Sequence, residues 1–158
     1  MGMRRSPGTL AVVLLLSGCA SAPVTEEVRK IREWERSLTV ALAWPFPGKK
    51  PLEDAVLEVH ADDLPRLGDG AHFLGQTYVE VDGLQILLAD IEDSHSNIQN
   101  AGVMRWYQSM RSGVFRIHYR YTFYRSHSSG PNYQDRFRDW AVIYSGVKSL
   151  TLEKRAPP

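Results

Sequence analysis

Cysteine is almost absent from this chain, which has one, at position 19, among its 158 residues. A lone thiol excludes an internal disulfide framework and leaves no cluster of thiolates for a zinc site. Long hydrophobic runs are also missing, because the run at residues 10–16 (LAVVLLL) is far shorter than the roughly 20 apolar residues of a membrane-spanning helix. We therefore expect neither a disulfide-stapled fold nor a helix that stays in the bilayer.

Recognisable catalytic and cofactor motifs are scarce as well. No serine stands in a G-x-S-x-G context, and no glycine-rich phosphate loop occurs. An acidic cluster at residues 90–95 lacks the spacing of a calcium loop, so we interpret it as a solvated loop. The sequence thus predicts no metal, no cofactor and no enzyme, although distant residues can still assemble a site. The five histidines, none of them spaced as in a zinc site, are His60, His72, His95, His118 and His127.

The first residues carry the pattern of an export signal. Arg4 and Arg5 precede the apolar run, and the run ends in residues 16–19 (LSGC). A charged start, a short apolar core and small residues are typical of a secretory signal. The ending resembles the lipobox of bacterial lipoprotein precursors. That resemblance implies cleavage between Gly18 and Cys19, a diacylglyceryl group on the Cys19 thiol, and an acylated new amino terminus.

Two other interpretations of this segment stay open. Ordinary signal cleavage after the small residues at 20–22 would release a protein without lipid. It would leave Pro23 as the first residue, which signal peptidases disfavour. Alternatively, the cysteine ends an apolar helix by chance. Neither alternative accounts for the charge, the length of the apolar run and the four-residue ending together.

The lipobox resemblance also implies an address. Two or more acyl chains anchor a protein stably, so a cysteine that carries three would hold it firmly. Ala20 follows the cysteine, where an aspartate would signal retention in the inner membrane. The resemblance therefore implies an outer-membrane lipoprotein that faces the periplasm, with the lipid on Cys19 as its only non-protein group. A nucleic-acid partner is not expected in that compartment.

Removal of the signal at residues 1–18 leaves 140 residues, which is the length of one compact domain. No internal repeat or low-complexity run divides this part. We expect a lipidated tether at 19–25, a single domain at 26–154 and a frayed tail at 155–158.

Hydrophobic periodicity predicts the elements of that domain. Residues 25–36 predict a short helix, which Thr25 can cap and whose first turn is acidic. Alternation with period two predicts half-buried strands at 38–44 and 55–61. Two more strands are expected at 139–145 and 147–153, without a clear pairing.

A strong hairpin signal lies between these segments, in the Asp-Gly pair at residues 82–83. Both residues of such a turn need positive φ, which this pair tolerates. With a two-residue turn, Val81 faces Leu84 and Thr77 faces Leu88, so apolar residues meet apolar residues.

A second, weaker turn signal is the Ser-Gly pair at residues 112–113. With a two- or four-residue loop there, one face of the hairpin becomes an apolar and aromatic band. On the other face Arg105 is opposite Arg120, and Tyr107 is opposite His118. Like charges that face each other destabilise a sheet, so a bound anion, solvent or an acidic neighbour should offset them.

These short and mostly antiparallel strands predict a mainly β fold. We expect an antiparallel β-sandwich, or a small β-barrel, with one short N-terminal helix. The aromatic band would then be core or, in a barrel, the lining of a lipid pocket. It consists of Trp106, Phe115, Tyr119, Tyr121 and Phe123.

The polar face of the second hairpin is the candidate anion- or partner-binding site. Residues 20–93 hold 15 acidic and 7 basic side chains, a net charge of −8, whereas residues 94–158 hold 3 and 10, a net of +7. Arginine suits the phosphates and carboxylates of envelope components, or an acidic protein. Alternatively, acidic segments such as 54–63 lie beside the hairpin and neutralise it. The site residues are Arg105, Tyr107, Arg116, His118 and Arg120.

We therefore expect an outer-membrane-anchored lipoprotein that acts without catalysis, as a binding or assembly component of a secretion or transport complex of the cell envelope. Its partners would be the membrane, through the anchor, and an envelope protein or an anionic envelope component. One alternative is a β-barrel carrier of a lipid or another apolar ligand. Another is a hydrolase whose site is assembled from distant residues.

Overall fold

The computed structural model describes most of the region that follows the signal-like segment. The described residues are 23–44, 48, 51–94, 98–100, 102–127 and 139–158. Cys19 and the rest of residues 1–22 lie outside them, as does His95. The elements, in chain order, are α1 (Glu26–Ser37), β1 (Thr39–Ala43), the short 3-10 helix η1 (Leu52–Asp54), β2 (Val56–His60), β3 (Ala71–Val81), β4 (Leu84–Glu92), β5 (Ile98–Asn100), α2 (Gly102–Ser109), β6 (Gly113–Ser126) and β7 (Trp140–Lys154).

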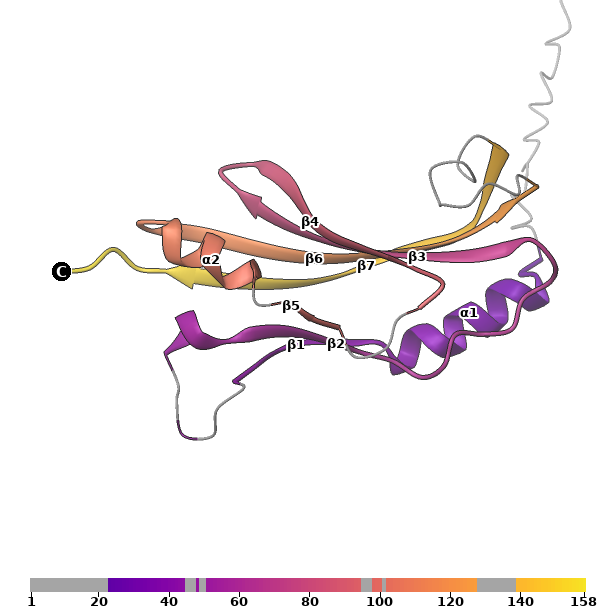
Figure 1. Cartoon of the computed structure of the whole chain (residues 1–158), viewed down its shortest axis with the longest axis horizontal. Helices are drawn as coiled ribbons and strands as arrows, with labels where there is room; N and C mark the ends of the chain where they lie inside the picture. Colours follow the sequence, from indigo (N-terminus) through magenta and orange to yellow (C-terminus); the bar gives the residue numbers. More distant parts are fainter. Residues whose placement is uncertain (1–22, 45–47, 49–50, 95–97, 101, 128–138) are drawn as a thin grey trace, which may run out of the picture.

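Two antiparallel sheets make the fold mainly β, as the sequence predicts. One has three strands in the order β1-β2-β5, and the other has four in the order β4-β3-β6-β7. In Figure 1 the four-stranded sheet forms the upper layer, and α1 and the three-stranded sheet lie side by side beneath it. The arrangement is sandwich-like, with α2 as a helix that the sequence does not predict. Within the described residues, no helix has the length and apolarity needed to cross a membrane.

The helix α1 is where the sequence places it. Thr25 caps it, since its Oγ accepts a hydrogen bond of 3.2 Å from the Val28 amide. Ile31 and Trp34 are its buried residues, and Trp34 makes edge contacts with the rings of Tyr121 and Phe123 at 5.5 and 5.3 Å. This helix therefore fills one half of the core beneath the four-stranded sheet.

The hairpin at Asp82 and Gly83 is confirmed. Both residues have positive φ, 51° and 79°, as a turn of this kind requires. Val81 pairs with Leu84 as predicted, but the register shifts after Tyr78, so that Thr77 pairs with Ala89 and not with Leu88. Leu88 is the extra residue of a β-bulge, a device that increases the local twist of the sheet.

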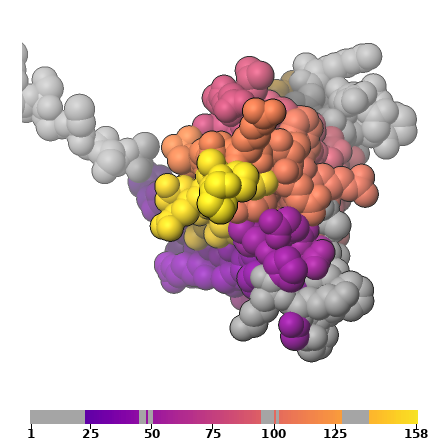
Figure 2. Space-filling model, turned by 90° about the vertical axis from the view of Figure 1, so that its left-hand side faces the viewer, coloured from indigo at the N-terminus to yellow at the C-terminus, as the bar shows by residue number. Residues whose placement is uncertain are grey.

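The second predicted hairpin is wrong. Residues 102–109 form α2, which buries Val103, Met104 and Tyr107 at helical spacing. The same apolar residues also fit period two, so the pattern alone was ambiguous. Capping decides in favour of the helix, because the Asn100 side chain accepts from the Gly102 amide at 3.0 Å and Lys154 donates to the last carbonyls. The end view in Figure 2 shows the orange residues, which include α2 and β6, between the β3–β4 turn above and η1 below.

The segments at 139–145 and 147–153 form one strand, β7. A register shift beside Phe123 and Tyr124 leaves Ile143 as an extra residue, and this bulge interrupts the alternation. Gly146 continues the strand where the ring of Tyr121 covers it, so a side chain there would overlap with the tyrosine hydroxyl. A bulge and a glycine inside one strand explain why the sequence suggested two.

Candidate binding face

The four-stranded sheet has one side that the core covers and one side that no described helix or strand covers in Figure 1. We call the uncovered part near the β3–β4 turn the outer face. Its side chains alternate with the buried ones along each strand. The outer face consists of Tyr78 and Glu80 of β3, Gln85 and Leu87 of β4, Val114, Arg116, His118 and Arg120 of β6, and Val147, Ser149, Thr151 and Glu153 of β7.

Three of the five residues expected in the binding site lie on this face, namely Arg116, His118 and Arg120. The other two do not join them. Arg105 is exposed on α2, and Tyr107 is 6% exposed, buried in the core against Phe115 at 5.8 Å between ring centres. The predicted site is therefore divided, because Arg105 and Tyr107 lie on the helix α2 and not on a strand next to β6.

The opposition of Arg105 and Arg120 does not occur. In the observed register Arg120 lies between Gln76 and Val147, and His118 lies between Tyr78 and Ser149. Neutral residues thus stand on both sides of Arg120. The predicted repulsion between Arg105 and Arg120 is therefore absent and cannot indicate a bound anion. The remaining indication of an anion is the environment of Arg120.

Glu80 neutralises part of the face. Its two carboxylate oxygens bind the Arg116 guanidinium at 2.8 Å and the His118 Nε2 at 3.1 Å. These hydrogen bonds, that from His118 first, lower the pKa of the Glu80 carboxyl. The acidic segment at 54–63 does not do this, since β2 belongs to the other sheet. The fold thus compensates part of the positive charge of β6, as one alternative predicted. The acidic residue comes from β3 of the same sheet and not from residues 54–63.

Arg120 is the cation that remains. It is exposed, and its guanidinium lies over the ring of Tyr78, 4.8 Å from the ring centre. Its polar contact within the described part of the chain is a long hydrogen bond of 3.5 Å to the side-chain oxygen of Gln85. Among the described residues no carboxylate forms an ion pair with it. A guanidinium that is held on an aromatic face, with donors to spare, suits a carboxylate or phosphate.

Aliphatic side chains flank these charges. Leu87, Val114 and Val147 are 44%, 46% and 54% exposed. Exposed aliphatic residues beside tyrosine and arginine give a composition typical of the centre of protein interfaces.

His118 also contacts Ser149, whose Oγ lies 2.7 Å from Nδ1. With Glu80 on Nε2, the three side chains form a row of hydroxyl, imidazole and carboxylate across β7, β6 and β3. Sequence reasoning missed this row because the three residues are far apart in the chain. Only the register of three strands brings them together.

One match to a catalytic serine motif does not form a catalytic pair in this fold. Residues 145–148 (SGVK) match the spacing S-x-x-K, which brings serine and lysine together on a helix. In β7 this spacing puts Ser145 on the outer side and Lys148 on the inner side. The two side chains therefore cannot act as a pair.

The aromatic band that was to line a lipid pocket is mostly core. Phe115, Tyr119, Tyr121 and Phe123 are at most 2% exposed, whereas Trp106 is 36% exposed on α2. Tyr119 is fully buried, and its hydroxyl has no hydrogen-bond partner within the described structure. These four side chains fill the space between the layers.

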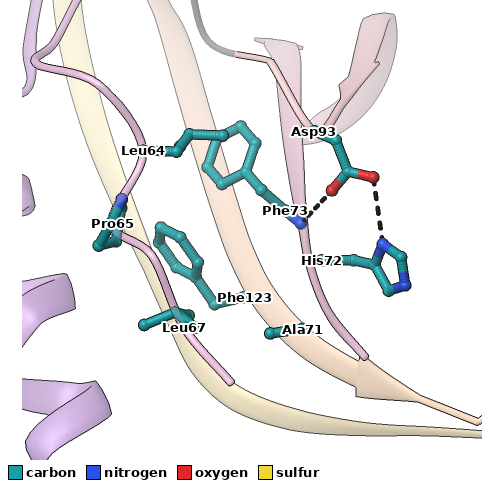
Figure 3. A pocket seen from close by; sticks show the side chains of 8 residues that line it. All are labelled: Leu64, Pro65, Leu67, Ala71, His72, Phe73, Asp93 and Phe123. Carbon is teal, nitrogen blue, oxygen red and sulfur yellow. Dashed lines mark hydrogen bonds and ion pairs between the residues drawn. The ribbon is translucent and has the colours of Figure 1, made fainter. Parts of the chain in front are cut away.

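The pocket in Figure 3 is small and lies at the other end of the sheet. Phe73, Phe123 and Leu64 point into it, and its volume of about 80 Å³ is far below the roughly 300–1,000 Å³ of ligand pockets. His72 and Asp93 pair at 3.1 Å on its rim and point away from the apolar rings.

Asp93 has a structural role at the end of β4. Its φ is 47°, its amide donates to the Phe73 carbonyl at 2.9 Å, and its carboxylate accepts from the Phe73 amide at 2.8 Å. The carboxylate thus completes the ladder in place of a backbone carbonyl. No group of three possible metal ligands occurs in the described parts of the chain.

Comparison with protein-family models, with curated proteins and with solved structures finds no match for this chain.

Proposed function

We propose that this protein is an outer-membrane-anchored lipoprotein that binds an envelope partner through its outer face, without catalysis. The observation that carries this proposal is the uncovered side of the four-stranded sheet, where Arg120 lies among exposed aliphatic side chains and forms no ion pair with any residue that the structure describes. A sheet face of this composition suits an acidic group flanked by apolar contacts.

The filled core favours a binding module over a carrier. A carrier of the predicted kind needs an apolar cavity, whereas Tyr119 and Tyr121 occupy the middle of the layer and are at most 1% exposed. A ligand of lipid size would have to displace several buried rings, at about 3–5 kcal/mol each on the scale of large core truncations.

The position of the anchor suits a partner at the outer face. Residues 20–25 link Cys19 to α1 and reach about 20 Å when extended. The start of α1 is held to the far end of β6, since Glu27 binds Arg125 at 2.5 Å. Arg120 precedes Arg125 by five residues in β6, which separates the two residues by about 17 Å. The anchored end and the outer face are thus at different ends of the sheet.

The anchor is tested with the full chain in a double-membraned bacterium. We expect the wild type to partition into detergent and to yield a triacylated peptide that begins at Cys19. Cys19→Ser should leave an unprocessed precursor without lipid. An unmodified thiol in the native protein, or a product that starts after position 19, would contradict the anchor.

The outer face is tested by photo-crosslinking in cells. A crosslinking amino acid at Val147 should give a defined adduct, and Arg120→Gln in the same chain should reduce it at least tenfold. The matched control carries the crosslinker at Thr39, an exposed position of the three-stranded sheet. Equal adducts from both positions, or none from Val147, would contradict docking at the outer face.

A further inference from the structure

The row of Ser149, His118 and Glu80 has the geometry of a nucleophile with its base and an orienting acid. Ser149 and His118 are direct cross-strand partners, with Oγ and Nδ1 2.7 Å apart. Glu80 lies diagonally across β3 and contacts Nε2 at 3.1 Å. The side chain of His118 is only 15% exposed, and each of its ring nitrogens contacts one of these two partners.

The charge of Glu80 fixes the direction of its hydrogen bond to His118. The bonds to His118 and Arg116 favour the ionised form of Glu80, so the carboxylate accepts a proton from Nε2. With Nε2 as the donor, the uncharged tautomer of the imidazole carries its lone pair on Nδ1. That lone pair accepts the Ser149 hydroxyl proton, which is the arrangement in which an imidazole activates a serine.

We propose that Ser149 is a base-activated nucleophile that accepts an acyl group from esters with a weakly basic leaving group. Ser149 Oγ attacks the carbonyl carbon, and its proton passes to Nδ1 of His118. The bond between that carbon and the leaving oxygen then breaks, and the leaving alkoxide or phenoxide takes the proton from His118. The products are an ester of Ser149 and a free alcohol or phenol, with no change of oxidation state.

The position of Ser149 restricts the donor to this class. Ser149 is exposed in the middle of β7, within the ladder to β6, and not at a turn where two backbone amides converge. Without such amides the developing oxyanion gains little stabilisation, which elsewhere contributes about 10²–10³ in rate. An unactivated ester should therefore not react, and the acylated serine should hydrolyse slowly. Ser149 is accordingly a stoichiometric acceptor, which is compatible with a protein that otherwise works by binding.

Ser145 provides a matched control within the same strand. It is exposed on the same side of β7, four residues away, and its cross-strand partner is Thr122, not a histidine. Any difference in reactivity between the two hydroxyls therefore reports on His118.

The test treats the purified full chain with p-nitrophenyl acetate and follows acetylation of each serine by peptide mass spectrometry. We expect one equivalent of nitrophenol per chain, an ester at Ser149 that hydroxylamine cleaves, and a rate at least tenfold above that of Ser145. His118→Gln should lower the Ser149 rate about a hundredfold. Glu80→Gln should lower it less, because the hydrogen bond survives without the charge. Circular dichroism of each variant shows that it is folded. Equal rates at the two serines, or an unchanged rate in folded His118→Gln, would overturn the proposal.

Discussion

Tyr119 and Tyr121 stand two residues apart on β6, and both are buried, but their hydroxyl groups differ. Tyr121 donates to the Glu35 carboxylate, which also accepts from Tyr144 at 2.9 Å. The Tyr119 hydroxyl has no partner in the described structure, and burial raises its pKa well above the ordinary value. A buried hydroxyl without a partner has lost its hydrogen bonds to water and has formed none within the protein, so it lowers the stability of the fold.

Removal of the hydroxyl group should therefore affect the stability of the protein differently at the two positions. Tyr119→Phe should leave the free energy of unfolding unchanged or raise it by up to about 1 kcal/mol. Tyr121→Phe should lower it by about 1–2 kcal/mol, because it removes a bond to a charged group. Urea unfolding of the two variants measures this difference. Equal losses would mean that Tyr119 has a partner that the geometry does not reveal.

Glu80 should make stability depend on pH in the acid range. Its pKa is lowered in the folded state, so the stabilisation is complete above the ordinary value of about 4.5 and is lost as the pH falls through the folded value. The difference in unfolding free energy between wild type and Glu80→Gln should therefore shrink as the pH falls below about 4.5. Chemical denaturation at a series of pH values measures the curve. A difference that grows at acid pH would contradict the assignment.

Gly146 is a position where the close approach of a ring demands glycine. A Cβ there would overlap with the Tyr121 hydroxyl and ring, which cover this residue from the opposite strand. Gly146→Ala should therefore cost about 1–3 kcal/mol, as overpacking in a core does. Ser145→Ala, one residue earlier and on the other side of the strand, should change stability by less than about 0.5 kcal/mol. Thermal unfolding of both variants compares them directly.

At the scale of elements, turn chemistry proved more informative than periodicity. The Asp-Gly pair at residues 82–83 predicted the hairpin and most of its register, because few residue pairs tolerate a turn with positive φ at both positions. The segment at 102–109 carried apolar residues at spacings that suit a helix and a strand equally. Its helix depends on Asn100 and on Lys154, which is 45 residues beyond its end, and no local pattern reveals the second contact.

The candidate site follows the same logic. Arg116, His118 and Arg120 could be recognised as one polar face from their alternation alone. Glu80 and Ser149 could not, because their partnership with His118 needs the pairing of β6 with β3 and β7. The sequence suggested a different neighbour for β6, and with it the wrong partners for each arginine.

Lys154 should be the element-scale determinant of α2. Its Nζ donates to the carbonyls of Tyr107 and Gln108 at 2.8 and 3.0 Å, where a cation also complements the helix dipole. Lys154→Met keeps most of the aliphatic chain and should lower the unfolding free energy by about 1–2 kcal/mol. Arg155→Met, the exposed neighbour, is the control and should have no measurable effect. If both variants lose the same stability, the carbonyl contacts do not hold the helix.

At the scale of the whole molecule, α1 and the three-stranded sheet form one covering layer. Trp34 makes edge contacts with three rings of the upper sheet, those of Phe73, Tyr121 and Phe123, at 5.3–5.6 Å. Its indole also donates to the Asp62 carbonyl at 3.0 Å, which ties the helix to the chain after β2. Since this side chain contacts both the four-stranded sheet and the segment that follows β2, α1 belongs to the core of the domain.

This role predicts where the chain can be shortened. A chain that begins at Pro23 keeps Thr25 and all of α1, and it should unfold in a single cooperative transition. A chain that begins at Leu38 loses Ile31 and Trp34, whose burial is worth about 1.5–3 kcal/mol each, and uncovers the rings beneath them. We expect this second chain to lack near-ultraviolet dichroism, to bind an apolar dye and to aggregate. If it folded cooperatively with the same midpoint as the first, α1 would be a linker, and the start of the domain would move to β1.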